Sequence, residues 1–312
     1  MFDITPYREL KIAPRAVFDA LDERRARPRF MLPTASGDWE AVTWGAYADA
    51  IRKLACALSA LGLGVGDRAA IFAPNRVQWI EAALAIQAAG GVMVPVYPAC
   101  TAEQAAYIVA HSDAKVLFVD TAALLSRVFE RFGELGSVQR VVLLDDALDV
   151  SKVLAELRAS GKPAPTIADV EAKVMGFARA MALGAARDAE APEAFMARMD
   201  SIELGQPALM LYTSGTTGNP KGVPLTHANV AQNGLDWLEC NAPMLEANAV
   251  DLLWLPMSHI FGLGEACLGN TLGFTTYLSD PLKVLGHLPE VKPNVFMSVP
   301  AYWEKLATGA MA

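Results

Sequence analysis

Cysteine is scarce in this sequence, and its spacing gives no sign of a metal or redox site. The four cysteines lie far apart, and no two form a Cys-x-x-Cys pair: Cys56, Cys100, Cys240 and Cys267. This spacing argues against a zinc site and against a thioredoxin-like redox motif. We expect reduced, mostly packed thiols in a cytoplasmic protein.

The sequence also lacks a long uninterrupted hydrophobic run. The longest apolar stretch, residues 82–100, is broken by Gln87, two glycines and two prolines. A membrane-spanning helix needs about 20 consecutive apolar residues, so this stretch predicts a helix followed by a strand. Residues 1–10 are polar and do not resemble a signal peptide.

Positive charge is in deficit. The chain has 26 Lys and Arg against 34 Asp and Glu, a formal charge of −8, so we expect no nucleic-acid partner bound through a general basic surface. A small basic run, Arg24, Arg25, Arg27 and Arg29, is interpreted as a solvated face. The 312 residues are enough for about two domains with substantial cores.

One segment is unusually informative about chemistry. Residues 212–223 form a loop of glycines, hydroxyl side chains and one lysine, after the apolar residues 208–212, which are expected to form a buried strand. Backbone N–H groups and hydroxyls can hold phosphate oxygens, and a lysine offsets their charge. The segment therefore predicts a phosphate-binding loop, and the alternative is a flexible surface loop. Its sequence is Tyr-Thr-Ser-Gly-Thr-Thr-Gly-Asn-Pro-Lys-Gly-Val.

The spacing excludes a Walker A loop, which requires Gly-x-x-x-x-Gly-Lys-Ser/Thr. Here Lys221 follows Pro220 and precedes Gly222. The segment instead resembles the signature of the adenylate-forming enzymes, which include acyl-CoA synthetases, luciferases and the adenylation domains of peptide synthetases.

Helices and strands are expected to alternate along residues 43–145. Thr43 is a candidate helix cap, Thr101 and Gln104 match a capping box, and His111 is expected at a helix end as a capping or surface residue. Glycines 62–66 end a helix and precede a strand, whereas a dinucleotide-binding fingerprint follows a strand, so we favour a helix cap. Strands separated by helices indicate parallel pairing and a layered α/β fold. Strands are expected at 68–73, 92–96, 115–120 and 140–145, and helices at 43–61, 77–89, 101–111 and up to 132.

The second half is expected to continue this pattern. Residues 151–200, rich in alanine and charge, are interpreted as a loosely packed helical connector. Thr226 is a candidate cap for the next helix, and Pro300 is expected to open the last one. Further strands are expected at 222–225, 250–255, 274–278 and 295–299.

Taken together, these features resemble the N-terminal part of a long-chain fatty-acyl-CoA synthetase, a long-chain-fatty-acid–CoA ligase of the adenylate-forming, AMP-binding superfamily. Besides the loop, the supporting segments are residues 66–68, 96–98, 255–262 and 299–305. The resemblance implies the α/β layers of parallel sheet and helix that form the N-terminal domain of these enzymes. It also implies a truncation before their β-barrel subdomain and C-terminal domain. We expect residues 1–200 to form a first subdomain with a helical connector, and 201–312 to begin a second, incomplete subdomain containing the phosphate loop.

The resemblance implies a two-step reaction with ATP, Mg²⁺ and coenzyme A. A fatty carboxylate attacks the α-phosphate of ATP to give an acyl-adenylate and pyrophosphate, and the thiol of coenzyme A then displaces AMP. Metal and loop donors would stabilise the phosphate charge. The resemblance leaves a homodimer and a peripheral membrane contact open.

Site roles follow from the same resemblance. His259 matches the family histidine at the mouth of the acyl pocket, and its alternative is a loop histidine bonded to backbone. Phe261 would line that pocket or belong to the core. Lys221, Thr216 and His259 are the candidate catalytic residues, and Thr216 would help place Mg²⁺. The residues expected to hold the β- and γ-phosphates are Thr213, Ser214, Gly215, Thr216, Thr217, Gly218 and Lys221.

Several family segments have no counterpart after residue 305: a Tyr-Gly-x-Thr-Glu segment, a ribose-binding Thr-Gly-Asp, a hinge and a catalytic lysine. We therefore expect the chain alone to be inactive. Two alternatives stay open. One is another acyl- or aryl-adenylate-forming enzyme, and the other is a non-catalytic nucleotide- or lipid-binding module.

Overall fold

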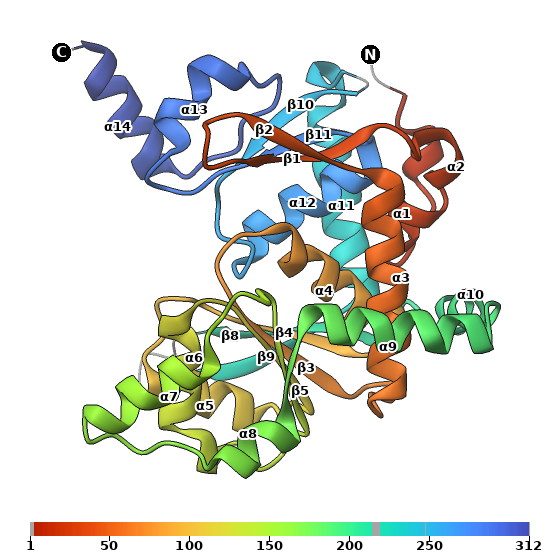
Figure 1. The fold of residues 1–312 in the computed structure, drawn as a ribbon. Helices are drawn as coiled ribbons and strands as arrows, with labels where there is room; N and C mark the ends of the chain where they lie inside the picture. Colours follow the sequence, from red (N-terminus) through yellow and green to blue (C-terminus); the bar gives the residue numbers. More distant parts are fainter. Residues whose placement is uncertain (1–2, 214–218, 247, 312) are drawn as a thin grey trace.

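The computed structural model describes residues 3–213, 219–246 and 248–311. Two β-sheets organise these residues, with helices between and around them (Figure 1). The helices α4 (Val77–Ala88) and α12 (Ile260–Leu272) lie between the two sheets.

The larger sheet has, among the described residues, seven strands in the order β7-β6-β5-β3-β4-β8-β9. Neighbours from β7 to β8 are parallel, and β8 pairs antiparallel with β9 as a hairpin. The strands are β3 (Arg68–Phe72), β4 (Val92–Val96), β5 (Val116–Val119), β6 (Arg140–Leu143), β7 (Val174–Gly176), β8 (Pro207–Thr213) and β9 (Lys221–Thr226).

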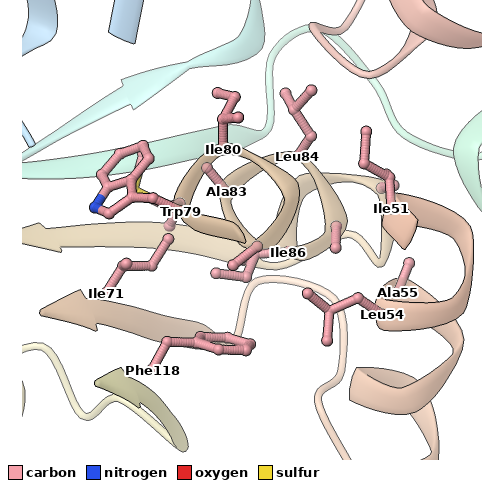
Figure 2. Close-up of a cluster of buried hydrophobic side chains, with 14 of the residues drawn as sticks. Ile51, Leu54, Ala55, Ile71, Trp79, Ile80, Ala83, Leu84, Ile86 and Phe118 are labelled. Carbon is pink, nitrogen blue, oxygen red and sulfur yellow. The ribbon is translucent and has the colours of Figure 1, made fainter. Parts of the chain in front are cut away.

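Helices cover both faces of this sheet because successive strand side chains point to opposite faces. Ile71 and Phe118 pack in one cluster with α4 and with α3 (Trp44–Ala60) (Figure 2). Phe72 and Val119 belong to a second cluster on the other face. That cluster is completed by α5 (Ala102–His111), α6 (Ala122–Glu130) and α7 (Val150–Ala159).

The smaller sheet has the order β10-β11-β1-β2. The pairs β10/β11 and β11/β1 are parallel, and β1/β2 is antiparallel. Its strands are β1 (Pro28–Pro33), β2 (Trp39–Thr43), β10 (Val250–Leu253) and β11 (Thr275–Leu278). Further helices outside residues 151–200 are η1 (Thr5–Tyr7), α1 (Arg15–Phe18), α2 (Leu21–Arg24), η2 (Phe132–Glu134), α11 (His227–Asn241), η3 (Ala242–Met244), α13 (Val284–Val291) and α14 (Pro300–Met311).

Residues 1–200 and residues 201–312 each contribute strands to both sheets. The first range supplies β1 and β2 to the smaller sheet, and the second supplies β8 and β9 to the larger one. The division into subdomains at this boundary stays a prediction.

The expectation of a solvated face for the N-terminal arginines is wrong for Arg29, which is completely buried. Its Nε donates to Asn270 Oδ1 at 2.7 Å, Nη1 to Thr276 Oγ1 at 2.5 Å and Nη2 to Ala266 O at 2.9 Å. Arg24 likewise donates to the Asn270 carbonyl at 2.9 Å. Arg29 thus bonds to α12 through Ala266 and Asn270, and a buried guanidinium is tolerated there only with its donors satisfied.

Residues 151–200 are largely helical as expected, but the expectation of loose packing is wrong. Residues 151–200 contain the edge strand β7 besides their helices, so they extend the larger sheet. A Cβ added to Gly184 would lie 1.7 Å from the Lys53 carbonyl oxygen, which shows how closely this segment packs on α3. The helices are α8 (Ile167–Lys173), α9 (Phe177–Glu190) and α10 (Ala194–Asp200).

The local helix signals are confirmed. Thr43 accepts from Ala46 N, Thr101 with Gln104 and Thr226 with Asn229 form capping boxes, and Gly62 has a positive φ of 88°. The strand expected at 295–299 is wrong: Val295 makes an isolated bridge to Asp251 and the next residues are irregular.

Candidate functional site

The β8–β9 hairpin brings together two of the predicted phosphate ligands. Thr213 ends β8 and Lys221 begins β9, and the two are register partners. Both side chains are exposed. The predicted ligands Ser214, Gly215, Thr216, Thr217 and Gly218 lie outside the described residues.

Lys221 is suited to an anionic ligand. Its side chain is exposed, and among the described residues no carboxylate forms an ion pair with it. An ammonium at the end of a hairpin, without an internal counter-ion, is available to offset phosphate charge.

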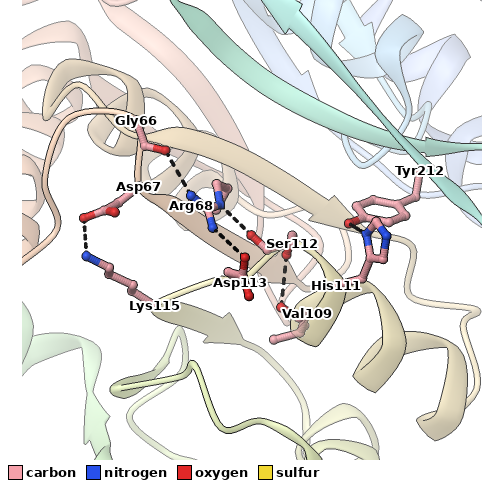
Figure 3. A network of polar contacts seen from close by, with 9 residues as sticks. All are labelled: Gly66, Asp67, Arg68, Val109, His111, Ser112, Asp113, Lys115 and Tyr212. Atoms are coloured by element: carbon pink, nitrogen blue, oxygen red, sulfur yellow. Dashed lines mark hydrogen bonds and ion pairs between the residues drawn. The ribbon is translucent and has the colours of Figure 1, made fainter.

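Tyr212, which precedes Thr213, is fastened to α5. Its Oη lies 2.8 Å from His111 Nδ1, as Figure 3 shows. Burial raises the pKa of the Tyr212 hydroxyl above its ordinary value. His111 is an exposed helix-end residue as expected, but sequence reasoning missed this contact with β8, the strand that enters the predicted phosphate loop.

The Gly66-Asp67-Arg68 segment has a structural role (Figure 3). Asp67 accepts from Lys115 Nζ at 2.6 Å and from Gly64 N at 2.7 Å, and Arg68 Nε donates to the Ser112 carbonyl at 2.5 Å. Burial acts to raise the pKa of Asp67, but the bonds from Lys115 and Gly64 outweigh it and lower the pKa. The segment therefore joins the start of β3 to the turn between α5 and β5.

His259 caps the helix α12. Its Nδ1 accepts from Phe261 N at 3.3 Å, and its ring is exposed. A Cβ on Gly262 would lie 2.4 Å from Pro256 O, so the first turn of α12 packs closely on the preceding loop and only glycine fits there. The backbone contact of the histidine agrees with the alternative considered for it, and a part in an acyl pocket stays a prediction.

A cavity of about 700 Å³ lies between the N-terminal segment, α11 and α12. Phe261, which is 37% exposed, lines it, whereas His259 is not among its described lining residues. No hydrogen bond or ion pair between described residues joins His259 or Phe261 to Thr213 or Lys221. The wall is largely apolar and includes Leu225, Val230, Trp237, Phe261, Leu268 and Met297.

Two buried carboxyl groups lie at this cavity, and sequence reasoning missed them: Glu265 is one of its lining residues, and Asp251 is the charged neighbour of Glu265. Neither carboxyl oxygen of Glu265 has a hydrogen-bond partner among the described residues, and burial together with the nearby Asp251 raises its pKa well above the ordinary value. Burial raises the pKa of Asp251 to about 7 against the opposing effect of Arg29. The signal in the sequence was an acidic residue within a mostly apolar segment, Glu265 in α12 and Asp251 in β10.

Among the described residues, no group of three or more His, Cys, Asp or Glu side chains could hold a metal ion. No described helix is long and apolar enough to cross a membrane. A cytoplasmic location, a homodimer and a peripheral membrane contact stay predictions.

Comparisons with known proteins show to which family the chain belongs. The chain is 32% identical over 274 residues to long-chain-fatty-acid–CoA ligase FadD15 of Mycobacterium bovis, covering 86% of this chain and 40% of that protein. It is 28% identical over 277 residues to long-chain-fatty-acid–CoA ligase ACSBG2 of Mus musculus, covering 86% and 38%. The chain thus spans about 40% of the length of these curated relatives.

A solved structure shows the same fold. The long-chain-fatty-acid-CoA ligase FadD1 from Archaeoglobus fulgidus matches with a TM-score of 0.72 at 19% identity, over 96% of this chain and 54% of that chain. The expected α/β layers are therefore confirmed. A family model described as "AMP-binding enzyme" matches residues 19–312. With nearly the whole chain matched, this protein belongs to the AMP-binding enzyme family.

Proposed function

We propose that the intact protein activates a long-chain fatty acid with ATP and transfers the acyl group to coenzyme A. The observation that supports this most directly is the path of β9. Lys221 begins this strand, and Leu225, near its other end, lines the apolar cavity. At about 3.3 Å per residue, one strand thus links a cation for phosphate to a pocket for an acyl chain.

In this proposal the hairpin holds the β- and γ-phosphates of ATP. Lys221 offsets their charge, and the hydroxyls and N–H groups of the loop donate to their oxygens. The hydroxyl of Thr216 helps to place Mg²⁺, which when bound withdraws charge from the phosphates. The loop ligands are Thr213, Ser214, Gly215, Thr216, Thr217 and Gly218.

The apolar cavity takes the alkyl chain. Its volume of about 700 Å³ lies within the range of roughly 300–1,000 Å³ of small-molecule sites. Phe261 forms part of the wall. His259, the N-cap of α12, precedes Phe261 in the chain with only Ile260 between them. The first step joins a carboxylate oxygen to the α-phosphorus and releases pyrophosphate. In the second step, the thiolate sulfur joins the acyl carbon. AMP then leaves with the oxygen that had joined the acyl carbon to the α-phosphorus.

The experiment incubates the intact protein with ATP, Mg²⁺ and coenzyme A and with straight-chain acids of increasing length or benzoate. Acyl-CoA and AMP are measured by chromatography. We expect both products in equal amounts, with kcat/KM highest for long chains. A preference for benzoate would favour an aryl-adenylate-forming enzyme, and ATP binding without any product would favour a non-catalytic module. Either result would contradict the proposal.

A further inference from the structure

The side chain of Asn75 holds two backbone groups that lie far away in the sequence. Its Nδ2 donates to the Leu255 carbonyl at 2.8 Å, and its Oδ1 accepts from the Met257 amide at 2.8 Å. A carbonyl can only accept and an amide N–H can only donate, so these partners fix which way the Asn75 amide faces. The two bonds therefore hold the residues on both sides of Pro256, Leu255 before it and Met257 after it.

This held loop leads directly to His259. The His259 amide donates to the Pro256 carbonyl at 2.9 Å, and the close approach of Gly262 to Pro256 leaves the start of α12 no room to shift. The place of His259 and Phe261 therefore depends on where Asn75 fixes the loop.

Asn75 itself is anchored to the larger sheet. It lies in the short turn between β3, an inner strand, and α4, whose Trp79 and Ile80 are completely buried (Figure 2). Arg76, the next residue, forms an ion pair of 2.6 Å with Asp120, just after β5. The larger sheet also contains the β8–β9 hairpin. Asn75 thus links the framework of the phosphate hairpin to the loop that precedes His259.

We propose that Asn75 is a positioning residue for acyl-adenylate formation. It fixes the position of the start of α12 relative to the sheet that holds the phosphates of ATP. In this way it also fixes the position of the acid at the cavity wall. This inference rests on the proposed function. Since misplacing a reactant by about 1 Å can cost on the order of 10²-fold in rate, loss of the two bonds should lower the rate of the chemical step more than it weakens ATP binding.

The first test needs no activity. Hydrogen exchange at the Met257 amide is measured in the wild type, Asn75→Ala, Asn75→Asp and Gln78→Ala. Gln78 is the matched control because it lies in the same region and its side chain accepts a bond from Arg76. We expect Asn75→Ala to exchange at least ~10-fold faster at Met257, since a lost hydrogen bond exposes the amide. Asn75→Asp keeps an acceptor and should remain close to the wild type. Unchanged protection in Asn75→Ala would overturn the inference.

The second test measures fatty-acid-dependent exchange of pyrophosphate into ATP. We expect a kcat for Asn75→Ala reduced roughly 10- to 100-fold with KM for ATP within about twofold, and a smaller reduction for Asn75→Asp. Thermal melting identifies a variant that does not fold, in which case Asn75→Asp decides the question. An active wild type with unchanged kcat in both variants would overturn the positioning role alone. An inactive wild type would overturn the proposed function, while the exchange at Met257 would still report whether Asn75 holds the Met257 amide.

Discussion

Lys221 is the side chain on which the phosphate role depends most directly. Replacing it with alanine removes a charge that, in our account, acts on ATP in the transition state. A contact of this kind is worth a few kcal/mol, so we expect pyrophosphate exchange to fall about 10²-fold or more. The melting temperature should change little, because the side chain is exposed and has no ion pair among the described residues. Lys152→Ala, the loss of an exposed lysine on α7, is the control. Equal rates in the two variants would contradict the assignment.

His259 caps α12, and in our proposal it is also a neighbour of the acid. His259→Ala loses both, and the lost cap should cost about 1 kcal/mol of unfolding free energy. His259→Asn keeps a side chain that is a good N-cap but removes the imidazole. We expect both variants to raise KM for the fatty acid more than KM for ATP, with stability reduced chiefly in the alanine variant. A normal fatty-acid KM in His259→Asn would leave the histidine with the capping role alone.

Local sequence patterns gave specific predictions, whereas contacts between distant residues could not be predicted. The composition of residues 212–223 is informative by itself, since the glycines, hydroxyls and lysine are contiguous. The bonds of Asn75 join residues 180 and 182 positions apart, and those of Arg29 join β1 to α12 across more than 230 positions. From the sequence alone, hydrophilic side chains such as Asn75 and Arg29 are expected at the surface. Only the topology shows which distant segments they bond.

At the scale of elements, the contact between α9 and α3 gives a direct test of packing. Gly184→Ala would place its Cβ 1.7 Å from Lys53 O and 2.6 Å from Lys53 C, both backbone atoms. We expect a loss of about 3 kcal/mol or more, since overpacking of this severity forces backbone to move. Gly234→Ala in α11 meets nothing within 4 Å and should stabilise the protein by up to about 1 kcal/mol through helix propensity. Urea denaturation of both variants measures the contrast, and a neutral Gly184→Ala would contradict the close packing.

Helix ends were predictable because caps are local. Thr43, Thr101 and Thr226 each mark a first turn through one side-chain bond to the backbone. Edge and short strands were not predictable in this way. The three-residue strand β7 forms because β6 offers it a partner. Residues 295–299 have a strand-like composition, but among them only Val295 forms a bridge, to Asp251. Strand formation depends on an available partner more than on the segment itself.

At the scale of the whole molecule, buried carboxyls should make stability depend on pH. Burial raises the pKa of Glu81 to about 8, above its ordinary value of 4.5. Between these two values the folded state keeps a proton that the unfolded state releases, so the unfolding free energy falls as pH rises, by at most about 1.4 kcal/mol per pH unit from this group. We expect Glu81→Gln to flatten the profile from pH 5 to 8, measured by urea denaturation.

The exposed Glu156→Gln serves as the control and should leave that slope unchanged. His227 acts in the opposite sense, because burial lowers its pKa to about 4, so its contribution is lost as pH falls below about 6.5. A slope that is the same in Glu81→Gln and the wild type would show that Glu81 is not held protonated in the folded state.

The layered α/β class was predictable from the alternation of strands and helices, but the order of strands was not. The chain builds both sheets from both halves: β1 and β2 join β10 and β11, and β8 and β9 join strands formed more than 90 residues earlier. Such long-range pairing depends on how the apolar faces of all sheets and helices become buried against one another. No local signal in the sequence encodes it.

The central claim is that a fatty carboxylate attacks the α-phosphate of ATP. The most direct measurement uses a long-chain fatty acid labelled with ¹⁸O in both carboxyl oxygens, with ATP, Mg²⁺, coenzyme A and the intact protein. Mass spectrometry then follows the label in AMP and acyl-CoA. Our account predicts one ¹⁸O in AMP and one in the thioester, since the bridging oxygen of the acyl-adenylate leaves with AMP. Unlabelled AMP, or ADP in place of AMP, would contradict it.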